Sequence, residues 1–208
     1  MKKLFAIVFA LISITVCAQN ETLFKIPIKN GVYGATVAKV GPINNEPGVF
    51  LGFQGGWIIN NRLVLGGKFN MLSNPIEPAG LYNINVGFIG GGAFFEYIFA
   101  SSKLLHFTAE ATVGSCMVYN DVARYAEEHD PIAYTGDSGF MLEPGANIVL
   151  NITNNFRLGV GATYRLVTNI NYDAGAPYQD AENSNYDFIS GSDLSGFTGQ
   201  IVLKYGLF

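Results

Sequence analysis

Residues 195–208 at the end of the chain (SGFTGQIVLKYGLF) alternate strictly between two kinds of side chain. One set is apolar and the other is small, polar or cationic: Phe197, Ile201, Leu203, Tyr205 and Leu207 against Thr198, Gln200 and Lys204. Successive side chains of a β-strand point to opposite faces. The segment therefore predicts a strand with one apolar and one polar face, and the rest of the chain has to supply partners for it.

The composition favours a β-barrel over a helical membrane protein. The chain has 208 residues, which is enough for one domain, and only 13% of them are charged, whereas Gly and aromatic residues are plentiful. No apolar run of about 18 residues follows the N-terminus, so no transmembrane helix is predicted. An apolar, Gly-rich and aromatic-rich chain of this kind is typical of a transmembrane barrel.

The first residues predict a secretory signal peptide. Lys2 and Lys3 precede an apolar segment, residues 4–16, and cleavage is expected after Ala18. The predicted division is a signal peptide at 1–18 and a barrel domain at 19–208. Lipoprotein processing with acylation of Cys17 is the alternative. The net charge of −4 becomes more negative when the two lysines are removed, which argues against nucleic acid as a partner.

Alternation predicts eight strands, at residues 31–40, 48–59, 62–72, 82–99, 104–119, 140–152, 156–169 and 195–208. The connections alternate in length. Those near 60–61, 100–103 and 153–155 are short, and those at 41–47, 73–80, 120–137 and 172–193 are longer. Short periplasmic turns, longer external loops and an even strand number predict an all-β fold, an eight-stranded antiparallel transmembrane β-barrel.

The segment 82–99 shows a change of phase. Val86 and Phe88 share a face with Glu96 if the strand is regular. A β-bulge near Gly90–Gly92 is predicted to separate them and to leave Glu96 facing inward.

Charged residues of the strands all fall on the less apolar face, which is predicted to line the lumen. This predicted ionic network consists of Lys39, Lys68, Glu96, His106, Glu110, Glu143, Arg157, Arg165 and Lys204. A Lys or Arg on a lipid-facing wall costs roughly 2–4 kcal/mol at the midplane, which accounts for a charge-free apolar face. A soluble periplasmic lipocalin-like binding barrel, with the apolar face inward, is the alternative.

An eight-stranded barrel is filled by side chains, so inward charges are expected to pair with one another. The turn positions predict which of them lie opposite across neighbouring strands: Glu143 and Arg165, Glu96 and His106, Gln54 and Lys68. We interpret the network as a structural plug; a gate or proton path is the alternative.

No catalytic, cofactor-binding or metal-binding residue is predicted. His106 lies near a periplasmic turn, and His129 lies in an acidic loop segment, 127–130, without the ligand spacing of a calcium loop. The acidic loop at 172–193 is interpreted as solvated charge. Aromatic residues are expected at the two membrane interfaces: Trp57, Tyr97, Phe99, Tyr164 and Tyr205.

From the signal peptide to the aromatic terminal residue Phe208, the chain resembles small outer-membrane β-barrel proteins of the OmpA/OmpX-like superfamily. In that family the final aromatic is usually in phase with the lipid-facing residues, whereas Phe208 falls on the luminal phase. The resemblance implies a non-enzymatic protein of the Gram-negative outer membrane, without cofactors, that serves envelope structure or surface interaction through its external loops. The implied partners are outer-membrane lipid, the barrel assembly machinery and an unidentified external ligand. A narrow pore or transporter is the alternative function.

Overall fold

The computed structural model describes residues 30–74, 76, 85–121, 136–173 and 188–208. The predicted signal peptide, the alternative acylation site at Cys17 and the loop segment around His129 lie outside these residues. Their predictions therefore stay predictions.

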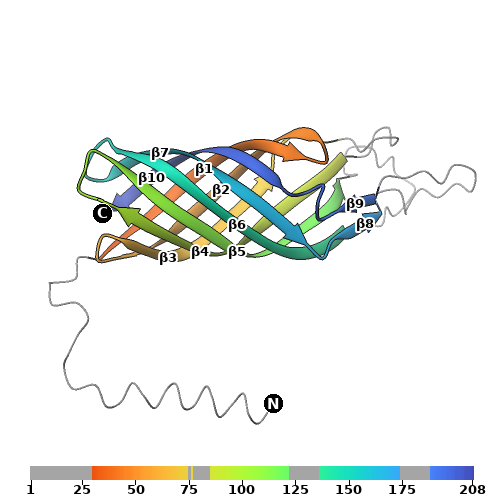
Figure 1. Ribbon diagram of the computed structural model, residues 1–208, viewed down its shortest axis with the longest axis horizontal. Coiled ribbons are helices and arrows are strands. Elements are labelled where there is room, and N and C mark those ends of the chain that lie inside the picture. Colours follow the sequence, from red (N-terminus) through yellow and green to blue (C-terminus); the bar gives the residue numbers. More distant parts are fainter. Residues whose placement is uncertain (1–29, 75, 77–84, 122–135, 174–187) are drawn as a thin grey trace, which may run out of the picture.

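Eight long strands form a closed antiparallel barrel (Figure 1). They are β1 (Gly31–Ile43), β2 (Glu46–Ile59), β3 (Leu63–Leu72), β4 (Asn85–Phe99), β5 (Leu105–Asp121), β6 (Gly136–Asn151), β7 (Phe156–Thr168) and β10 (Gly196–Leu207). Neighbours in sequence are neighbours in the barrel, and β10 pairs with β1 to close it. Two short strands, β8 (Asn171–Asp173) and β9 (Phe188–Ser190), form a separate two-stranded sheet between β7 and β10. The predicted all-β fold, an eight-stranded antiparallel β-barrel, is confirmed.

The two ends of the barrel differ. At one end, called the terminal end, β1 begins, β10 ends, and short turns join β2 to β3, β4 to β5 and β6 to β7 (Figure 1). At the other end, called the loop end, β8 and β9 extend beyond the barrel strands. Three of the four connections at the loop end are long, as predicted.

The fourth loop-end connection is short, so the predicted loop at 41–47 is wrong. β1 and β2 stay paired as far as Ile43 and Glu46, and the turn consists of Asn44 and Asn45, both with positive φ (49° and 61°). Two central residues with positive φ give the turn whose twist matches that of antiparallel strands, and Asn adopts that conformation more readily than most residues. Gly41 and Pro42 therefore belong to the strand rather than to a loop.

The predicted bulge in β4 is also wrong. β4 keeps one register with β3 from Leu63–Tyr97 to Met71–Ile89, and one register with β5 along its whole length. Val86 and Phe88 face inward together with Glu96. The phase does not change, because the barrel interior is apolar at the loop end and accepts these two side chains.

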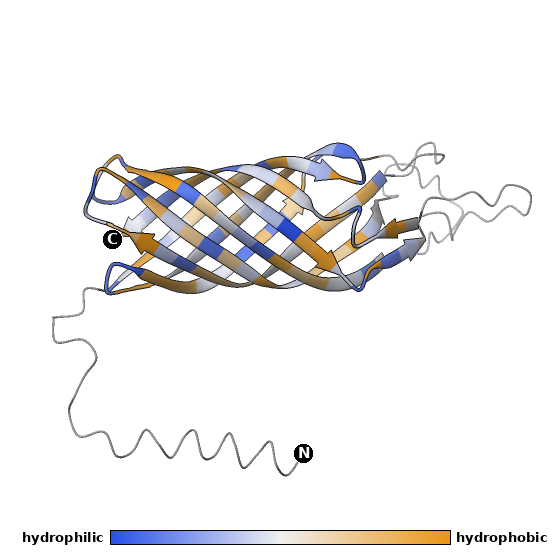
Figure 2. Ribbon diagram, viewed as in Figure 1, coloured by the Kyte–Doolittle hydropathy of each residue, from blue (hydrophilic) through white to orange (hydrophobic). Residues whose placement is uncertain are grey.

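Alternation along each strand separates a buried set of side chains from an exposed set, and Figure 2 shows it as alternating colours along the ribbons. The exposed set is apolar around the whole circumference, with members on every barrel strand: Val32, Leu51, Phe53, Trp57, Leu65, Phe69, Phe95, Phe107, Ile148, Val160, Ile201 and Leu203 among others. Within the described residues no helix is long and apolar enough to cross a membrane.

Two strand glycines offer a test of how tightly the strands pack. A Cβ on Gly66 would lie 1.9 Å from the carbonyl oxygen of Gly55, whereas a Cβ on Gly34 would meet nothing within 4 Å. We expect Gly66→Ala to lower the free energy of unfolding by about 1–3 kcal/mol, because the strands must move apart. Gly34→Ala should change it by less than about 0.5 kcal/mol. Urea unfolding of the refolded barrel measures both, and equal effects would contradict the packing.

Candidate functional site: the barrel interior

The structure places all nine residues of the predicted ionic network inside the barrel. Each of them is buried, Arg157 least so at 9% exposed. They come from seven different strands, because every strand of a closed barrel turns one face to the lumen. They do not form one continuous network, however. Their ion pairs join strands that are not neighbours in the barrel, whereas pairs across neighbouring strands were expected.

The centre of the interior is a layer of ion pairs. Lys68 lies 2.7 Å from a carboxylate oxygen of Glu110 and 3.7 Å from one of Glu143, and Lys39 also pairs with Glu143. These pairs join strands that are not neighbours, β1 with β6 and β3 with β5. The long side chains therefore cross the lumen and occupy its cross-section.

Two amides complete the hydrogen bonding of Glu110. The Nδ2 of Asn147 donates to Oε2 of Glu110 (2.8 Å), and the Nε2 of Gln200 donates to Oε1 (3.0 Å) and to the amide oxygen of Asn147 (2.7 Å). A buried ion pair is stable only when its remaining hydrogen-bonding capacity is also used. The two amides supply this for Glu110.

A second group of polar contacts lies closer to the terminal end. Lys204 pairs with Glu96, whose other oxygen accepts a hydrogen bond of 2.6 Å from the hydroxyl of Tyr33. The ammonium of Lys204 also lies 4.9 Å from the centre of the Tyr33 ring, and Gln54 donates to the Tyr33 hydroxyl over 3.3 Å. The partners of Glu96 thus lie on β1 and β10, across the barrel from β4 and β5.

The structure tests the three predicted opposite pairs. Gln54 and Lys68 are ladder partners, as predicted. Glu143 lies opposite Arg165, as predicted, because the flanking partners are Leu142–Leu166 and Gly145–Thr163.

The third predicted pair is wrong, because Glu96 lies opposite Glu110 and not His106. The predicted pair required a turn centred on Ser101, whereas the observed ladder, which includes Phe99–Phe107, is centred on Lys103 and places Glu110 opposite Glu96. The turn spans residues 100–104 and begins at Ala100, which has positive φ (52°). Glu110 forms an ion pair with Lys68, and Glu96 forms one with Lys204. The two opposite carboxylates therefore pair with different cations.

Arg165 has no carboxylate partner among the described residues and is held by carbonyl oxygens. Its Nε donates to Leu194 (2.5 Å) and its Nη2 to Pro42 (2.8 Å), while the guanidinium lies over the rings of Phe50 and Phe88, 4.4 and 5.1 Å from their centres. Arginine suits this position because its planar head can stack on rings and donate in its own plane.

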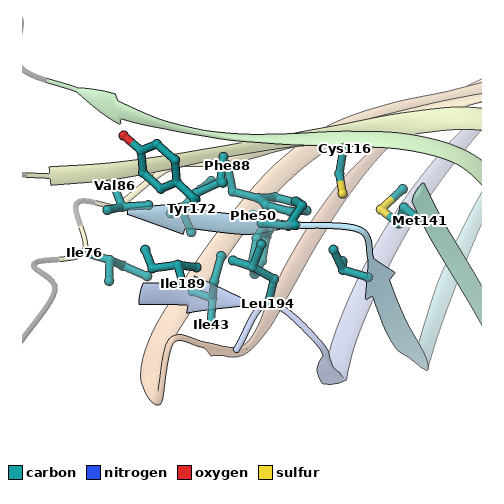
Figure 3. Packing of buried hydrophobic residues seen from close by; sticks show 14 residues of the cluster. Ile43, Phe50, Ile76, Val86, Phe88, Cys116, Met141, Tyr172, Ile189 and Leu194 are labelled. Atoms are coloured by element: carbon teal, nitrogen blue, oxygen red, sulfur yellow. The ribbon is translucent and has the colours of Figure 1, made fainter. Parts of the chain in front are cut away.

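Apolar side chains fill the interior at the loop end (Figure 3). This loop-end cluster is made of Ile43, Phe50, Leu72, Ile76, Val86, Phe88, Cys116, Val118, Met141, Val167, Ile170, Tyr172, Ile189 and Leu194. Tyr172 of β8, Ile189 of β9 and Leu194 beyond it lie against the barrel side chains in the close-up view. The small sheet therefore contributes its apolar residues to the barrel interior.

Hydrogen bonds fix the segment that follows β9. The Asp193 carboxylate accepts from the backbone N–H and the hydroxyl of Ser190 (2.9 and 2.6 Å), and the Asp193 carbonyl accepts from the backbone of Asn44 in the β1–β2 turn (2.6 Å). Ser195 accepts from the backbone of Val167 (2.9 Å). Together with Arg165 these bonds attach the segment to β1 and β7.

A smaller apolar cluster lies at the terminal end: Tyr33, Ala35, Val37, Ile58, Val64, Phe94, Ile98 and Val202. Phe208 packs against it, with its ring 5.8 Å from that of Tyr33 and the guanidinium of Arg157 3.7 Å from its centre. The terminal residue thus faces the lumen, in agreement with its phase in the sequence.

Sequence reasoning missed the loop-end cluster and the neutral partners Tyr33, Asn147 and Gln200. The spacing of Phe50, Val86 and Phe88 could have predicted the cluster. These apolar residues lie an even number of positions from the inward polar residues of the same strands, so an unbroken strand places them inward as well. The hydrogen bonds of the amides had no such signal, since they depend on which strands meet across the lumen.

In the described part of the chain no three metal-ligating side chains gather. His106 is buried on β5, and the thiol of Cys116 is buried in the loop-end cluster, 3.8 Å from the carbonyl oxygen of Gly139. The predicted interfacial aromatics Trp57, Tyr97, Phe99, Tyr164 and Tyr205 are exposed. Tyr97 and Phe99 form an edge contact, as do Tyr164 and Phe197.

Comparison with solved structures finds outer-membrane proteins with the same architecture. Neisserial surface protein A superposes with a TM-score of 0.57 at 11% identity, covering 88% of this chain and 99% of that one. The N-terminal β-barrel domain of Pseudomonas aeruginosa OprF gives 0.54 at 9% identity (87% and 100%). The chain therefore shares its fold with these small outer-membrane β-barrels, as the resemblance to the OmpA/OmpX-like superfamily implied. The outer-membrane protein OprG from Pseudomonas aeruginosa gives 0.51 at 10% identity (86% and 95%). No protein-family model and no curated protein sequence matches the chain.

The central ion pairs predict a strongly non-additive response to mutation. Glu143→Gln leaves Lys39 without a carboxylate, so we expect the free energy of unfolding to fall by about 3–5 kcal/mol. The double variant Lys39→Met/Glu143→Leu should recover most of this loss, because it removes both charges and keeps the volume. Urea unfolding followed by Trp57 fluorescence measures the free energy of unfolding of both variants. A double variant that loses as much free energy of unfolding as Glu143→Gln would contradict the pairing.

Proposed function

We propose that this protein is a non-enzymatic outer-membrane protein whose barrel spans the bilayer, with a closed lumen, and which serves envelope structure or surface interaction through its loop end. The observation that carries the proposal is the distribution of charge: apolar side chains surround the barrel, and the nine charged side chains of the predicted network are buried within it, whereas the strand charges Glu46 and Asp137 lie at its loop end.

The exposed apolar surface supports a lipid environment. Phe53, Trp57, Phe107, Phe197 and Tyr205 are each more than half exposed. Monomeric soluble proteins rarely expose a continuous apolar surface of this extent. Trp57, Phe107 and Tyr205 lie near the terminal end and Phe197 lies near the loop end, positions that membrane interfaces favour for aromatic residues.

The interior argues against a ligand-binding lipocalin-like barrel. Such a protein would turn an apolar cavity inward and a charged face outward. Here the central layer is filled by Lys39, Lys68, Glu110 and Glu143, whose ion pairs cross it. The apolar clusters at the two ends consist of packed, buried side chains.

The same packing supports a closed lumen. Water and ions that entered from the loop end would have to displace Tyr172, Ile189 and Leu194, which are at most 4% exposed, and then break the central ion pairs. The surface role of the loop end is supported by the fold shared with Neisserial surface protein A. The ligand or surface it meets, and the role of the barrel assembly machinery in its insertion, are part of the proposal.

A single outward substitution separates a membrane barrel from a soluble one. Ile201 is exposed near the middle of β10, and Ser102 is exposed in the β4–β5 turn. We expect Ile201→Arg to lower the free energy of unfolding in lipid bilayers by about 2–4 kcal/mol, and Ser102→Arg, the control, to have little effect. A negligible cost of Ile201→Arg would contradict burial in lipid.

Cell fractionation tests location and insertion together. We expect the protein in the outer-membrane fraction, with different gel mobility in boiled and unboiled SDS samples, because a closed hydrogen-bonded barrel resists SDS until it is heated. A soluble periplasmic protein without a shift would refute the proposal.

Conductance tests the closed lumen. We expect the purified protein in planar bilayers to give no stable single-channel steps. Regular steps from the wild-type protein would support the pore alternative and would place the function in the lumen.

A further inference from the structure

Two exposed cations, Arg62 and Lys103, lie at the rim of the terminal end. Arg62 is the last residue of the β2–β3 turn, and Lys103 lies in the β4–β5 turn. The ion pairs of the described residues all lie inside the barrel, so neither of these two cations has a carboxylate partner among them. Their charges are therefore available to a partner outside the chain.

Hydrogen bonds fix the backbone of both cations beside the end of β4. The carbonyl of Arg62 accepts from the N–H of Ile98 (2.6 Å), and the N–H of Lys103 donates to the carbonyl of Ala100 (2.9 Å). The carbonyl of Lys103 also accepts from the Nδ2 of Asn151 (2.8 Å). Ile98 and Ala100 are only two residues apart, so the two cations flank one strand end, one from the β3 side and one from the β5 side.

The outer wall next to these cations is apolar and aromatic. Tyr97 and Phe99, the last two outward residues of β4, form an edge contact with ring centres 4.7 Å apart. Phe99 is the ladder partner of Phe107, which is 60% exposed, and Leu104 is 69% exposed. Membrane-spanning barrels place such aromatic side chains where acyl chains meet headgroups. The turns that carry the two cations lie just beyond this band, at the level of the headgroups.

The positive charge lies on one side of the terminal end. Residues 152–155, which join β6 to β7 at the same end, carry no charge. At the loop end the described charged side chains outside the interior are acidic: Glu46, Asp137 and Asp193. An anionic group is therefore attracted to the terminal end beside β3, β4 and β5, and not to the described rim of the loop end.

We propose that Arg62 and Lys103 together bind the headgroup of an anionic phospholipid in the leaflet around the terminal end. The inference rests on the proposed membrane-spanning barrel. The guanidinium of Arg62 can donate to two phosphate oxygens at once, and the ammonium of Lys103 supplies a second positive charge. A headgroup that carries phosphate without an ammonium fits both cations. Zwitterionic phospholipids bring their own ammonium into the same positive potential and should bind more weakly.

Trp57 reports on lipid at this site. It is the only tryptophan of the chain, is 55% exposed, and lies near the end of β2 opposite Leu65 of β3. The full chain is refolded into phosphatidylcholine vesicles that contain a fixed fraction of phosphatidylglycerol, with bromine on the acyl chains of one of the two lipids at a time. We expect brominated phosphatidylglycerol to quench Trp57 beyond its share of the bilayer, with a local preference of about threefold or more.

Substitutions at the rim separate the two cations from net charge. Arg62→Gln/Lys103→Gln should remove the preference, and Lys103→Arg should keep it. The matched control Arg62→Gln/Asn154→Arg has the wild-type net charge, but its new arginine is exposed in the β6–β7 turn, across the barrel from β2. It should lose as much of the preference as Arg62→Gln alone. Each variant is first checked for folding by its gel mobility before and after heating.

Equal quenching by the two brominated lipids in the wild-type protein, relative to their shares of the bilayer, would overturn the inference and leave the membrane barrel standing. An unchanged preference in Arg62→Gln/Lys103→Gln, or a full preference in Arg62→Gln/Asn154→Arg, would overturn it as well. A protein that neither brominated lipid quenches, and that shows no heat-dependent change of gel mobility, would refute the proposed membrane barrel itself.

Discussion

Closure of eight strands into a barrel is the constraint on which the rest of this structure depends. Every strand must turn one face inward, and the interior of so small a barrel is just wide enough to be filled by side chains. An inward charge therefore has no bulk water around it and must find its partner across the lumen. The pairing of Lys39 with Glu143 and of Lys68 with Glu110 joins strands that are not neighbours in the wall. The ion pairs between these buried charges thus connect non-neighbouring strands inside the barrel.

The interior is divided along the barrel axis. Apolar side chains occupy the loop end, ion pairs and amides the centre, and a mixed group the terminal end. This division explains why the cations are used differently. The compact ammonium of Lys68 meets carboxylates in the centre, whereas Arg165, at the boundary of the apolar cluster, lies on the rings of Phe50 and Phe88 and donates to carbonyl oxygens. Lysine could not reproduce both contacts of Arg165 at once.

Part of the connection between β7 and β10 also packs inside the barrel at the loop end. Residues between β7 and β10 would be expected to lie outside the barrel, as external connections do. Instead Ile170, Ile189 and Leu194 lie in the loop-end cluster, and Arg165 is bonded to the carbonyl of Leu194. The described parts of this connection are therefore packed as part of the barrel core. They keep Asp173 and Phe188, the ends of the two short strands, paired at the loop end.

The sequence by itself determined the number of barrel strands, their approximate ends, which face of each strand is apolar except in the first part of β4, and that the nine charged side chains belong together on the other face. These follow from local rules, because the period of two is fixed by the backbone of each strand. Only the tertiary structure decided the partners. A β4–β5 turn centred on Lys103 instead of Ser101 placed Glu96 opposite Glu110 and not His106. Two asparagines with positive φ replaced the expected loop at 41–47, and the apolar loop-end cluster made the expected bulge in β4 unnecessary. Ion pairs such as Lys204–Glu96 arise between strands that meet across the lumen, and that proximity depends on closure and stagger of the whole barrel, which no local pattern records.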